Sequence, residues 1–286
     1  MDVREQEKIR QAVRKRYGQL VEPGLETVQG QKPVSGCCAS SPASESGPVR
    51  GCGCGSSQLP ELSSEEFQQL LGYSLQDLAS APEGANMGLG CGNPVALASL
   101  DPGETVVDLG SGGGFDCLLA AKRVGPQGRV IGVDMTPEMV SKARLNADKV
   151  KAANVEFRLG EIEHLPVADN SADIIMSNCV INLSADKSQV YQEAFRVLKP
   201  NGRVAISDIL TLKPLPAAIQ KDLALVSACI GGAATIEDTR RLLENTGFTD
   251  IRIDAHPISA EVIDAFASDN EAGSYVVSAN IMARKP

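Results

Sequence analysis

Histidine is scarce in this chain of 286 residues, which contains only His164 and His256. So few imidazoles leave little material for acid–base catalysis by histidine or for a histidine-rich zinc site. Long apolar runs are also lacking, because the longest, Leu223 to Ala234, is too short to span a bilayer. The charged beginning, Met1 to Gln6, is unlike a secretory signal. We therefore expect a soluble, cytoplasmic protein without a membrane partner.

Basic residues are fewer than acidic ones, 27 against 36, so the net charge is −9. A negatively charged protein repels a phosphate backbone, which makes nucleic acid an unsuitable substrate. At this length, with 43% hydrophobic residues, the chain can bury one substantial core. One core with additions is favoured over two full domains, and we expect a monomer that acts on a small molecule.

Three consecutive segments are predicted. Residues 1–60 form a flexible arm, with a loosely attached helix over 3–17 and a Cys-rich linker that is too polar to bury a core. Residues 61–212 alternate strands and helices, the pattern of a Rossmann-like, doubly wound α/β fold with a mainly parallel sheet. Ligands of such sheets bind beyond the carboxyl ends of the strands. Residues 213–286 form a small α+β extension that begins with a helix over 216–230.

A glycine-rich turn follows the strand predicted over 105–109, and glycine there permits close approach by a bound cofactor. A second strand ends in Asp134, about twenty residues further on, where a carboxylate can hold ribose hydroxyls. A dinucleotide site would have glycine at the position of Phe115, and Asp108 would repel its phosphates. The amino and sulfonium groups of S-adenosylmethionine would instead be attracted. The turn therefore favours the sulfonium cofactor.

Over roughly residues 85–250 these segments resemble the class I S-adenosylmethionine-dependent methyltransferases. The resemblance implies that the glycine loop cradles the methionine part of the cofactor, that Asp134 holds the ribose and that Met135 packs on adenine. A Rossmann-like domain with another ligand is the alternative. The cofactor-binding residues that it implies are Asp108, Gly110, Ser111, Gly112, Gly114, Asp134, Met135, Glu161, Ile162 and Asn178.

The chain contains eight cysteines, although nothing in it indicates an oxidising compartment. In a reducing compartment, cysteines are more often ligands, nucleophiles or redox centres than disulfide partners. Cys91, Cys179 and Cys229 are each predicted at the ligand edge of the fold. Buried cysteine also serves as a small hydrophobe, and we favour that packing role for Cys117.

With their surroundings, the three cysteines at the ligand edge resemble those of the arsenite methyltransferases. The matching segments are Gly84–Pro94, Ser177–Leu183 and Cys229–Ala233. The resemblance implies that Cys91, Cys179 and Cys229 bind arsenic(III) and that S-adenosylmethionine methylates it, giving mono- and dimethylated arsenicals. It also implies a thiol reductant, thioredoxin or glutathione, as co-substrate. Soft thiolates suit arsenic(III), whose lone pair stays free to attack the methyl group.

Four further cysteines, Cys37, Cys38, Cys52 and Cys54, lie in the predicted linker. In the family, an N-terminal cysteine cooperates with the cysteine that stands at the position of Cys91, and the two can form a disulfide after turnover. The resemblance does not say which of the four has that role here. Our interpretation is an arm that captures arsenite and passes it to the core; the alternative is an exposed thiol cluster with incidental metal affinity.

Two other functions remain open. A non-enzymatic thiolate protein would bind arsenic or zinc without turnover, but it has no need of a ribose-binding carboxylate at Asp134. A class I methyltransferase acting on a quinone-type ring carbon would use the cofactor segments. The three placed cysteines have no task in that reaction.

Overall fold

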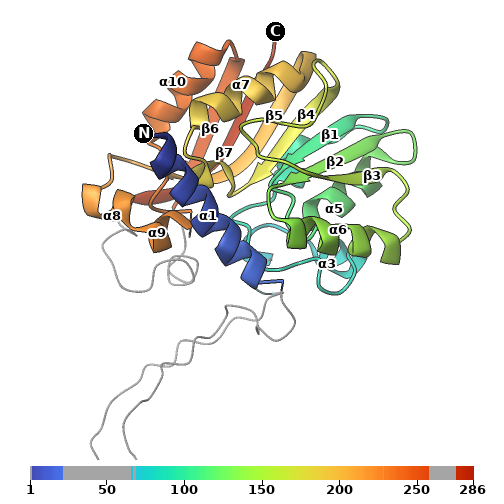
Figure 1. The fold of residues 1–286 in the computed structure, drawn as a ribbon. Coiled ribbons are helices and arrows are strands. Elements are labelled where there is room, and N and C mark those ends of the chain that lie inside the picture. Colours follow the sequence, from blue (N-terminus) through green and yellow to red (C-terminus); the bar gives the residue numbers. More distant parts are fainter. Residues whose placement is uncertain (1, 22–65, 67–68, 228, 258–274) are drawn as a thin grey trace, which may run out of the picture.

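The structure, a computed structural model, describes residues 2–21, 66, 69–227, 229–257 and 275–286. Its strands are β1 Thr105–Leu109, β2 Arg129–Asp134, β3 Val155–Leu159, β4 Ala172–Asn178, β5 Leu198–Thr211, β6 Thr249–His256 and β7 Val276–Arg284. They form one sheet in the order β3-β2-β1-β4-β5-β7-β6. The first five strands pair in parallel, and β7 runs antiparallel to both β5 and β6. The predicted doubly wound, mainly parallel sheet is confirmed (Figure 1).

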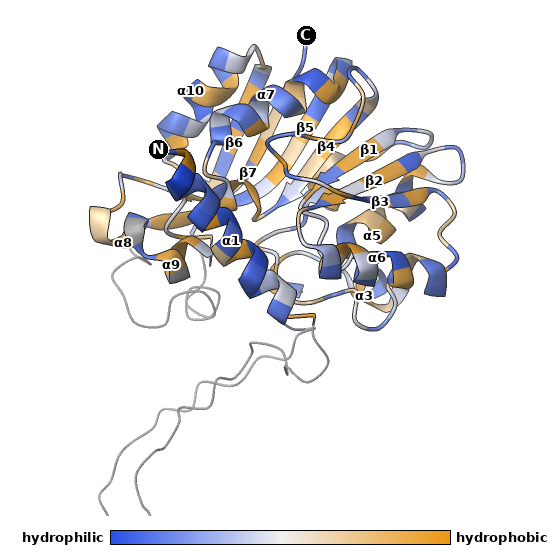
Figure 2. Cartoon of the chain, in the orientation of Figure 1, coloured by the Kyte–Doolittle hydropathy of each residue, from blue (hydrophilic) through white to orange (hydrophobic). Residues whose placement is uncertain are grey.

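The helices of the described residues are α1 Val3–Gln19, α3 Leu75–Ser80, α4 Pro94–Ala98, α5 Phe115–Val124, α6 Pro137–Lys149, α7 Lys187–Val197, α8 Ala217–Lys221, α9 Leu223–Ser227 and α10 Ile236–Thr246, with a 3-10 turn, η1, at Ile181–Leu183. Successive side chains of a strand point to opposite faces of the sheet. Val106 accordingly packs with α4, α5 and α6, whereas Val107 packs with α7 and α10. Both faces are covered, so the central strands are apolar on both sides (Figure 2).

The turn between β1 and α5 depends on glycine. Gly110, Gly112 and Gly114 have positive φ angles of 69°, 51° and 86°. A Cβ atom on Gly110 would overlap the side chain of Val180, and one on Gly114 would lie 2.8 Å from Phe157. The N–H of Gly110 donates to the carbonyl of Val133 at 2.8 Å, which ties the turn to β2. The loop therefore lies across the carboxyl ends of the strands with its backbone close to any ligand there.

The helix predicted over 216–230 is interrupted. The chain becomes extended at Asp222, so α8 and α9 are separate and α9 ends at Ser227. The Asp222 carboxylate accepts from the N–H of Leu225 at 3.3 Å, the bond of an N-cap, which starts a new helix. Cys229 therefore lies in a turn with a φ of 65° instead of in a helix.

The expectation that the N-terminal helix is loosely attached is wrong. Val13 is 2% exposed, and α1 contacts α6, α9 and η1. Arg10 and Arg14 each form an ion pair of 3.4 Å with Glu161. The helix thus lies across the carboxyl edge of the sheet (Figure 1). No helix in the described part of the chain combines the length and the hydrophobicity that a bilayer crossing needs.

We expect Gly110→Ala to destabilise the fold more than Gly103→Ala. Both glycines have a positive φ, so each substitution imposes backbone strain of about 1–2 kcal/mol. A Cβ at Gly103 meets no atom within 4 Å, whereas one at Gly110 overlaps Val180. Urea unfolding should therefore show an additional loss of about 1 kcal/mol or more for Gly110→Ala. Equal losses for the two variants would contradict the close approach of Val180.

Candidate active site

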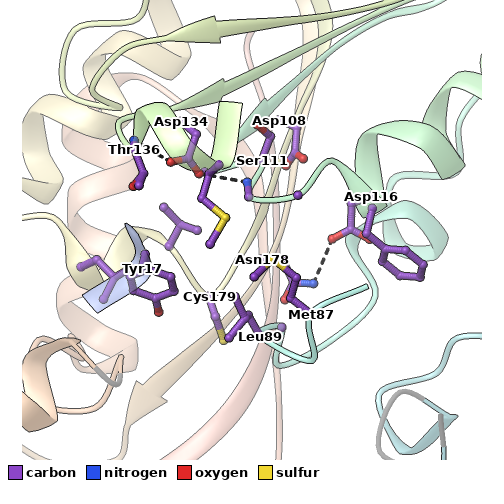
Figure 3. A pocket seen from close by; sticks show the side chains of 18 of the residues that line it. Tyr17, Met87, Leu89, Asp108, Ser111, Asp116, Asp134, Thr136, Asn178 and Cys179 are labelled. Atoms are coloured by element: carbon purple, nitrogen blue, oxygen red, sulfur yellow. Dashed lines mark hydrogen bonds between the residues drawn. The ribbon is translucent and has the colours of Figure 1, made fainter. Parts of the chain in front are cut away.

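A cavity lies at the carboxyl ends of β1, β2 and β4, bordered by the glycine loop and α1 (Figure 3). Most of the predicted cofactor residues line it, namely Asp108, Gly110, Ser111, Gly112, Asp134, Met135, Ile162 and Asn178. Two others do not. Gly114 packs the start of α5 against Phe157 and Ala143, and Glu161 pairs with Arg10 and Arg14 of α1.

Asp134 is positioned at the end of β2 by two backbone donors. Its Oδ2 atom accepts from the N–H of Gly112 at 2.9 Å, and its Oδ1 atom accepts from the N–H of Thr136 at 2.8 Å. Burial raises the pKa of this carboxyl. Because a carboxylate can accept about four hydrogen bonds, both oxygens keep capacity for the hydroxyls of a ligand.

Two more carboxyl groups face the cavity beside the glycine loop. Burial raises the pKa of Asp108 well above its usual value, and the nearby charge of Asp116 raises it further. Burial also raises the pKa of Asp116, although Tyr73 Oη and Asn178 Nδ2 donate to its oxygens at 2.6 and 3.1 Å. Within the described part of the chain, neither carboxylate forms an ion pair with lysine or arginine. The cavity therefore suits a positively charged ligand.

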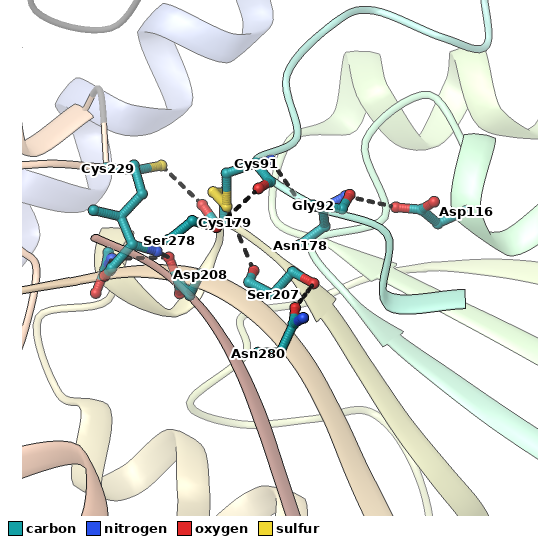
Figure 4. The surroundings of a disulfide bond; sticks show 12 residues. Cys91, Gly92, Asp116, Asn178, Cys179, Ser207, Asp208, Cys229, Ser278 and Asn280 are labelled. Carbon is teal, nitrogen blue, oxygen red and sulfur yellow. Dashed lines mark hydrogen bonds between the residues drawn. A yellow bond between two sulfur atoms is a disulfide. The ribbon is translucent and has the colours of Figure 1, made fainter. Parts of the chain in front are cut away.

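The three cysteines of the predicted arsenic site come together beside this cavity. They are buried in one apolar cluster. Cys91 comes from the loop before α4, Cys179 from the end of β4 and Cys229 from the turn after α9. A disulfide joins Cys91 and Cys179, whose Cα atoms are 5.8 Å apart (Figure 4). The Sγ atom of Cys229 donates to the carbonyl of Cys179 at 2.8 Å. The two joined cysteines need reduction before they can bind a metalloid as thiolates.

The remaining predicted cysteines, Cys37, Cys38, Cys52 and Cys54, lie outside the described residues, so their role stays a prediction. Cys117 is fully buried in α5 and donates to Asp108 Oδ2 at 3.1 Å. Its position agrees with a packing residue.

Sequence reasoning missed Asp208, which is 2% exposed near the end of β5. One of its carboxylate oxygens and the Sγ atoms of Cys91 and Cys179 all lie within 4.8 Å of one another. Burial raises the pKa of Asp208 to about 7, against the lowering effects of the Ile209 N–H and the charge of Lys187. Ligands of parallel sheets bind beyond the carboxyl ends of the strands, which is why Cys179 was predicted in the site. Asp208 lies near the carboxyl end of β5, so the same argument could have predicted it from the sequence.

Sequence reasoning also missed Tyr17 of α1, because its helix was expected to be loosely attached. The hydroxyl of Tyr17 lies 4.0 Å from Cys229 Sγ and 3.5 Å from the Ser227 carbonyl oxygen. Burial raises the pKa of Tyr17 well above its usual value and that of Cys229 to about 12. Since Arg10 and Val13 line the cavity too, α1 borders both the cavity and the cysteine cluster.

Replacing Asp108 by Asn is expected to stabilise the ligand-free protein at neutral pH. Burial raises the pKa of Asp108 above the value of about 3.9 that it has in an unfolded chain. As the pH rises from about 4 through the raised folded pKa, ionisation of this buried carboxyl lowers the free energy of unfolding. An amide does not ionise, so it removes this loss. Thermal unfolding at a series of pH values should show the largest gain in Tm at the highest pH.

Asp173→Asn is the matched control for that experiment. Although burial acts to raise it, the pKa of Asp173 is lowered overall by bonds from Lys199 and Thr105. Its ionised form is therefore stabilised by folding, and the amide should cost stability at neutral pH. A lower Tm of Asp108→Asn than of the wild type at high pH would show that other groups of the protein compensate the charge of Asp108.

Comparisons with known proteins agree with this geometry. Residues 100–247 match the family model described as a methyltransferase domain. An arsenite methyltransferase of Halobacterium salinarum is 47% identical over 99% of this chain, which spans 68% of that protein. An arsenite methyltransferase of Aquipseudomonas alcaligenes is 45% identical over 62% of this chain and 53% of its own length.

A solved structure is similar as well. The arsenic(III) S-adenosylmethionine methyltransferase of Chlamydomonas reinhardtii matches with a TM-score of 0.58 at 32% identity, over 77% of this chain and 73% of that one. Sequence and fold thus lead to the same group of proteins, and the chain belongs to the arsenite methyltransferase family of S-adenosylmethionine-dependent enzymes.

Proposed function

We propose that the protein transfers methyl groups from S-adenosylmethionine to thiolate-bound arsenic(III), giving mono- and dimethylated arsenicals in arsenic detoxification. One observation carries the proposal: Cys179 lines the same cavity as Asp108 and Asp134. A cation-binding pocket and a cluster of soft sulfur ligands therefore share a wall. A reaction between a sulfonium methyl group and a thiophilic atom needs both at once.

The residues around the cavity fit the cofactor. S-adenosylmethionine supplies the methyl group when it is bound. The glycine loop offers an open cradle, since a Cβ at Gly112 would meet no atom within 4 Å. Asp134 would accept from the ribose hydroxyls, and the negative charges of Asp108 and Asp116 would offset those of the ammonium and sulfonium groups. Met135 and Ile162 provide apolar surface for adenine.

The cysteine cluster would hold the substrate once it is reduced. A thiol reductant, thioredoxin or glutathione, would deliver two electrons and two protons, and the Cys91–Cys179 disulfide would become two thiols. Each thiol then forms a sulfur–arsenic bond as an arsenic–oxygen bond breaks, and its proton leaves with the hydroxide as water. Thiolate-bound arsenic keeps a lone pair, which carries no proton, so the transfer requires no general base. The chain's task is to hold arsenic in line with the methyl group.

Three further features belong to this proposal. The protein is a monomer in this proposal, and it acts on a small molecule. The proposed reaction needs Cys91 and Cys179 as thiols, which a reducing compartment maintains, so a cytoplasmic location belongs to the proposal. The proposed segments are residues 1–60, whose helix α1 is packed against the core, a cofactor-binding domain of 61–212 and an extension of 213–286. The extension supplies Cys229, and its strands β6 and β7 complete the central sheet.

The direct test is product analysis. Purified protein would be incubated with methyl-labelled S-adenosylmethionine, arsenite and a thiol reductant, and the arsenicals would be separated. Labelled mono- and dimethylated arsenic is the expected result. Binding of arsenic without transfer of label would favour the non-enzymatic thiolate protein.

Cys229→Ser is expected to abolish methylation of arsenite. A hydroxyl is harder and much less acidic than a thiol, so it cannot replace sulfur on arsenic. Cys117→Ser is the matched control, because that buried thiol donates to Asp108 and a hydroxyl can do the same. Initial rates of label transfer would be compared for the two variants. A Cys229→Ser rate close to that of the wild type would remove this residue from the site.

Asp134→Asn is expected to weaken the binding of S-adenosylmethionine by about 1.5–3 kcal/mol for each charge-assisted hydrogen bond that is lost. The amide has one acceptor oxygen, whereas the carboxylate holds Gly112 and Thr136 with two. Calorimetric titration measures the change in Kd. Asp148→Asn, on the exposed side of α6, controls for the loss of a negative charge. Equal dissociation constants for both variants would exclude Asp134 from the cofactor site.

A further inference from the structure

The carboxylate of Asp208 is only half used by the protein. Its Oδ1 atom accepts from Asn182 Nδ2 and from the N–H of Ile209, each at 2.8 Å. Its Oδ2 atom is buried and has no hydrogen-bond partner among the described residues. The backbone N–H groups of Ile181 and Asn182 are near enough to lower the pKa of Asp208. Neither meets the distance and angle of a hydrogen bond to Oδ2. An unbonded buried carboxylate oxygen is costly, so a ligand that donates to it is favoured.

The carboxylate of Asp208 lies beside two sulfur atoms. A carboxylate oxygen of Asp208 and the Sγ atoms of Cys91 and Cys179 are within 4.8 Å of one another (Figure 4). The Sγ atom of Cys229 is not part of this group, because it is directed to the carbonyl of Cys179. An arsenic atom held by the first two sulfurs would therefore have the carboxylate within reach of its third substituent.

That third substituent is a hydroxyl when the substrate is arsenite. Arsenic(III) in water carries three hydroxyl groups, and two sulfur–arsenic bonds displace two of them as water. The remaining hydroxyl is a hydrogen-bond donor, and a carboxylate is a strong acceptor. Carboxylate oxygen is a hard donor that thiolates outcompete for a soft centre, so we expect a hydrogen bond here instead of a bond to arsenic.

The cation nearest to this carboxylate leaves its free oxygen available. Lys187 is buried close enough to influence Asp208, but its Nζ donates to the carbonyl of Ser184 at 3.0 Å. No ion pair between Lys187 and Asp208 forms among the described residues. The positive charge offsets part of the cost of the buried carboxylate without occupying Oδ2.

We infer that Asp208 is a further substrate-binding residue, which accepts a hydrogen bond from the hydroxyl of arsenic(III) while Cys91 and Cys179 hold the arsenic atom. Cys229 then displaces that hydroxyl: a sulfur–arsenic bond forms, the arsenic–oxygen bond breaks, and the thiol proton leaves with the hydroxide as water. Asp208 thereby selects arsenic that still carries a hydroxyl. This inference rests on the proposed methylation of arsenic.

The test compares two forms of arsenic(III) in the reduced full-length protein. One is arsenite with a phosphine reductant, which leaves the hydroxyls in place. The other is preformed tris-glutathione arsenic(III) with the same phosphine, which carries no hydroxyl. Initial transfer of label from S-adenosylmethionine would be measured for wild type, Asp208→Asn and the distant control Asp173→Asn. The amide places a donor where Oδ2 accepts, because its oxygen is needed by Asn182 and Ile209.

We expect Asp208→Asn to lower the rate with arsenite by about 10- to 100-fold, the usual effect of losing a hydrogen bond to a charged group. Its rate with tris-glutathione arsenic should stay within about threefold of wild type, and Asp173→Asn should keep the wild-type ratio of the two rates. A purely structural role of Asp208 would lower both rates equally, and no role would lower neither. Either result overturns the inference.

Two other outcomes are also decisive. Asp208→Asn should melt cooperatively, since an amide replaces a buried carboxyl; failure to fold would show that the carboxylate is structural and would overturn the inference. If wild type transfers no label to either form of arsenic, the proposed function itself fails. The two failures are thus distinguishable in one experiment.

Discussion

The side chain of Asn178 holds the two halves of the site together. Its Oδ1 atom accepts from the N–H of Cys91 at 2.9 Å, and its Nδ2 atom donates to Gly92 O at 2.9 Å and to Asp116 at 3.1 Å. A Cβ on Gly90 would lie 2.5 Å from Nδ2, so the loop can approach this closely only through glycine. One amide at the end of β4 thereby places Cys91 next to the carboxyl groups that line the cavity.

Burial makes this arrangement costly in the absence of ligands. It raises the pKa of Asp108, Asp116 and Asp208, which means that each carboxylate is less stable inside the protein than in water. In the proposed function, a cationic cofactor would lower this cost in the first two cases. In the third, a hydroxyl donor on the substrate would do so. The site thus gives up stability that its proposed ligands would restore, a common feature of functional sites.

The helix α1 covers one side of the site. It buries Val13, forms ion pairs with Glu161 and brings Tyr17 to the turn of Cys229. Covering a cavity reduces its contact with water, which strengthens electrostatic interactions inside it. The polar composition of α1 concealed its contact with the cavity, because only one side of a surface helix needs apolar residues.

By itself, the sequence determined the sheet and the position of the glycine turn after β1. Strand and helix periods, the glycine turn at Gly110 and the carboxylate at Asp134 are local signals, set by side-chain spacing and backbone freedom. Only tertiary structure decided that α1 covers the cavity, that the helix over 216–230 is interrupted, and that Asp208 lies beside Cys91 and Cys179. These features depend on which residues meet after strands distant in sequence align their carboxyl ends. No local pattern contains that information, because packing between segments overrides local preference.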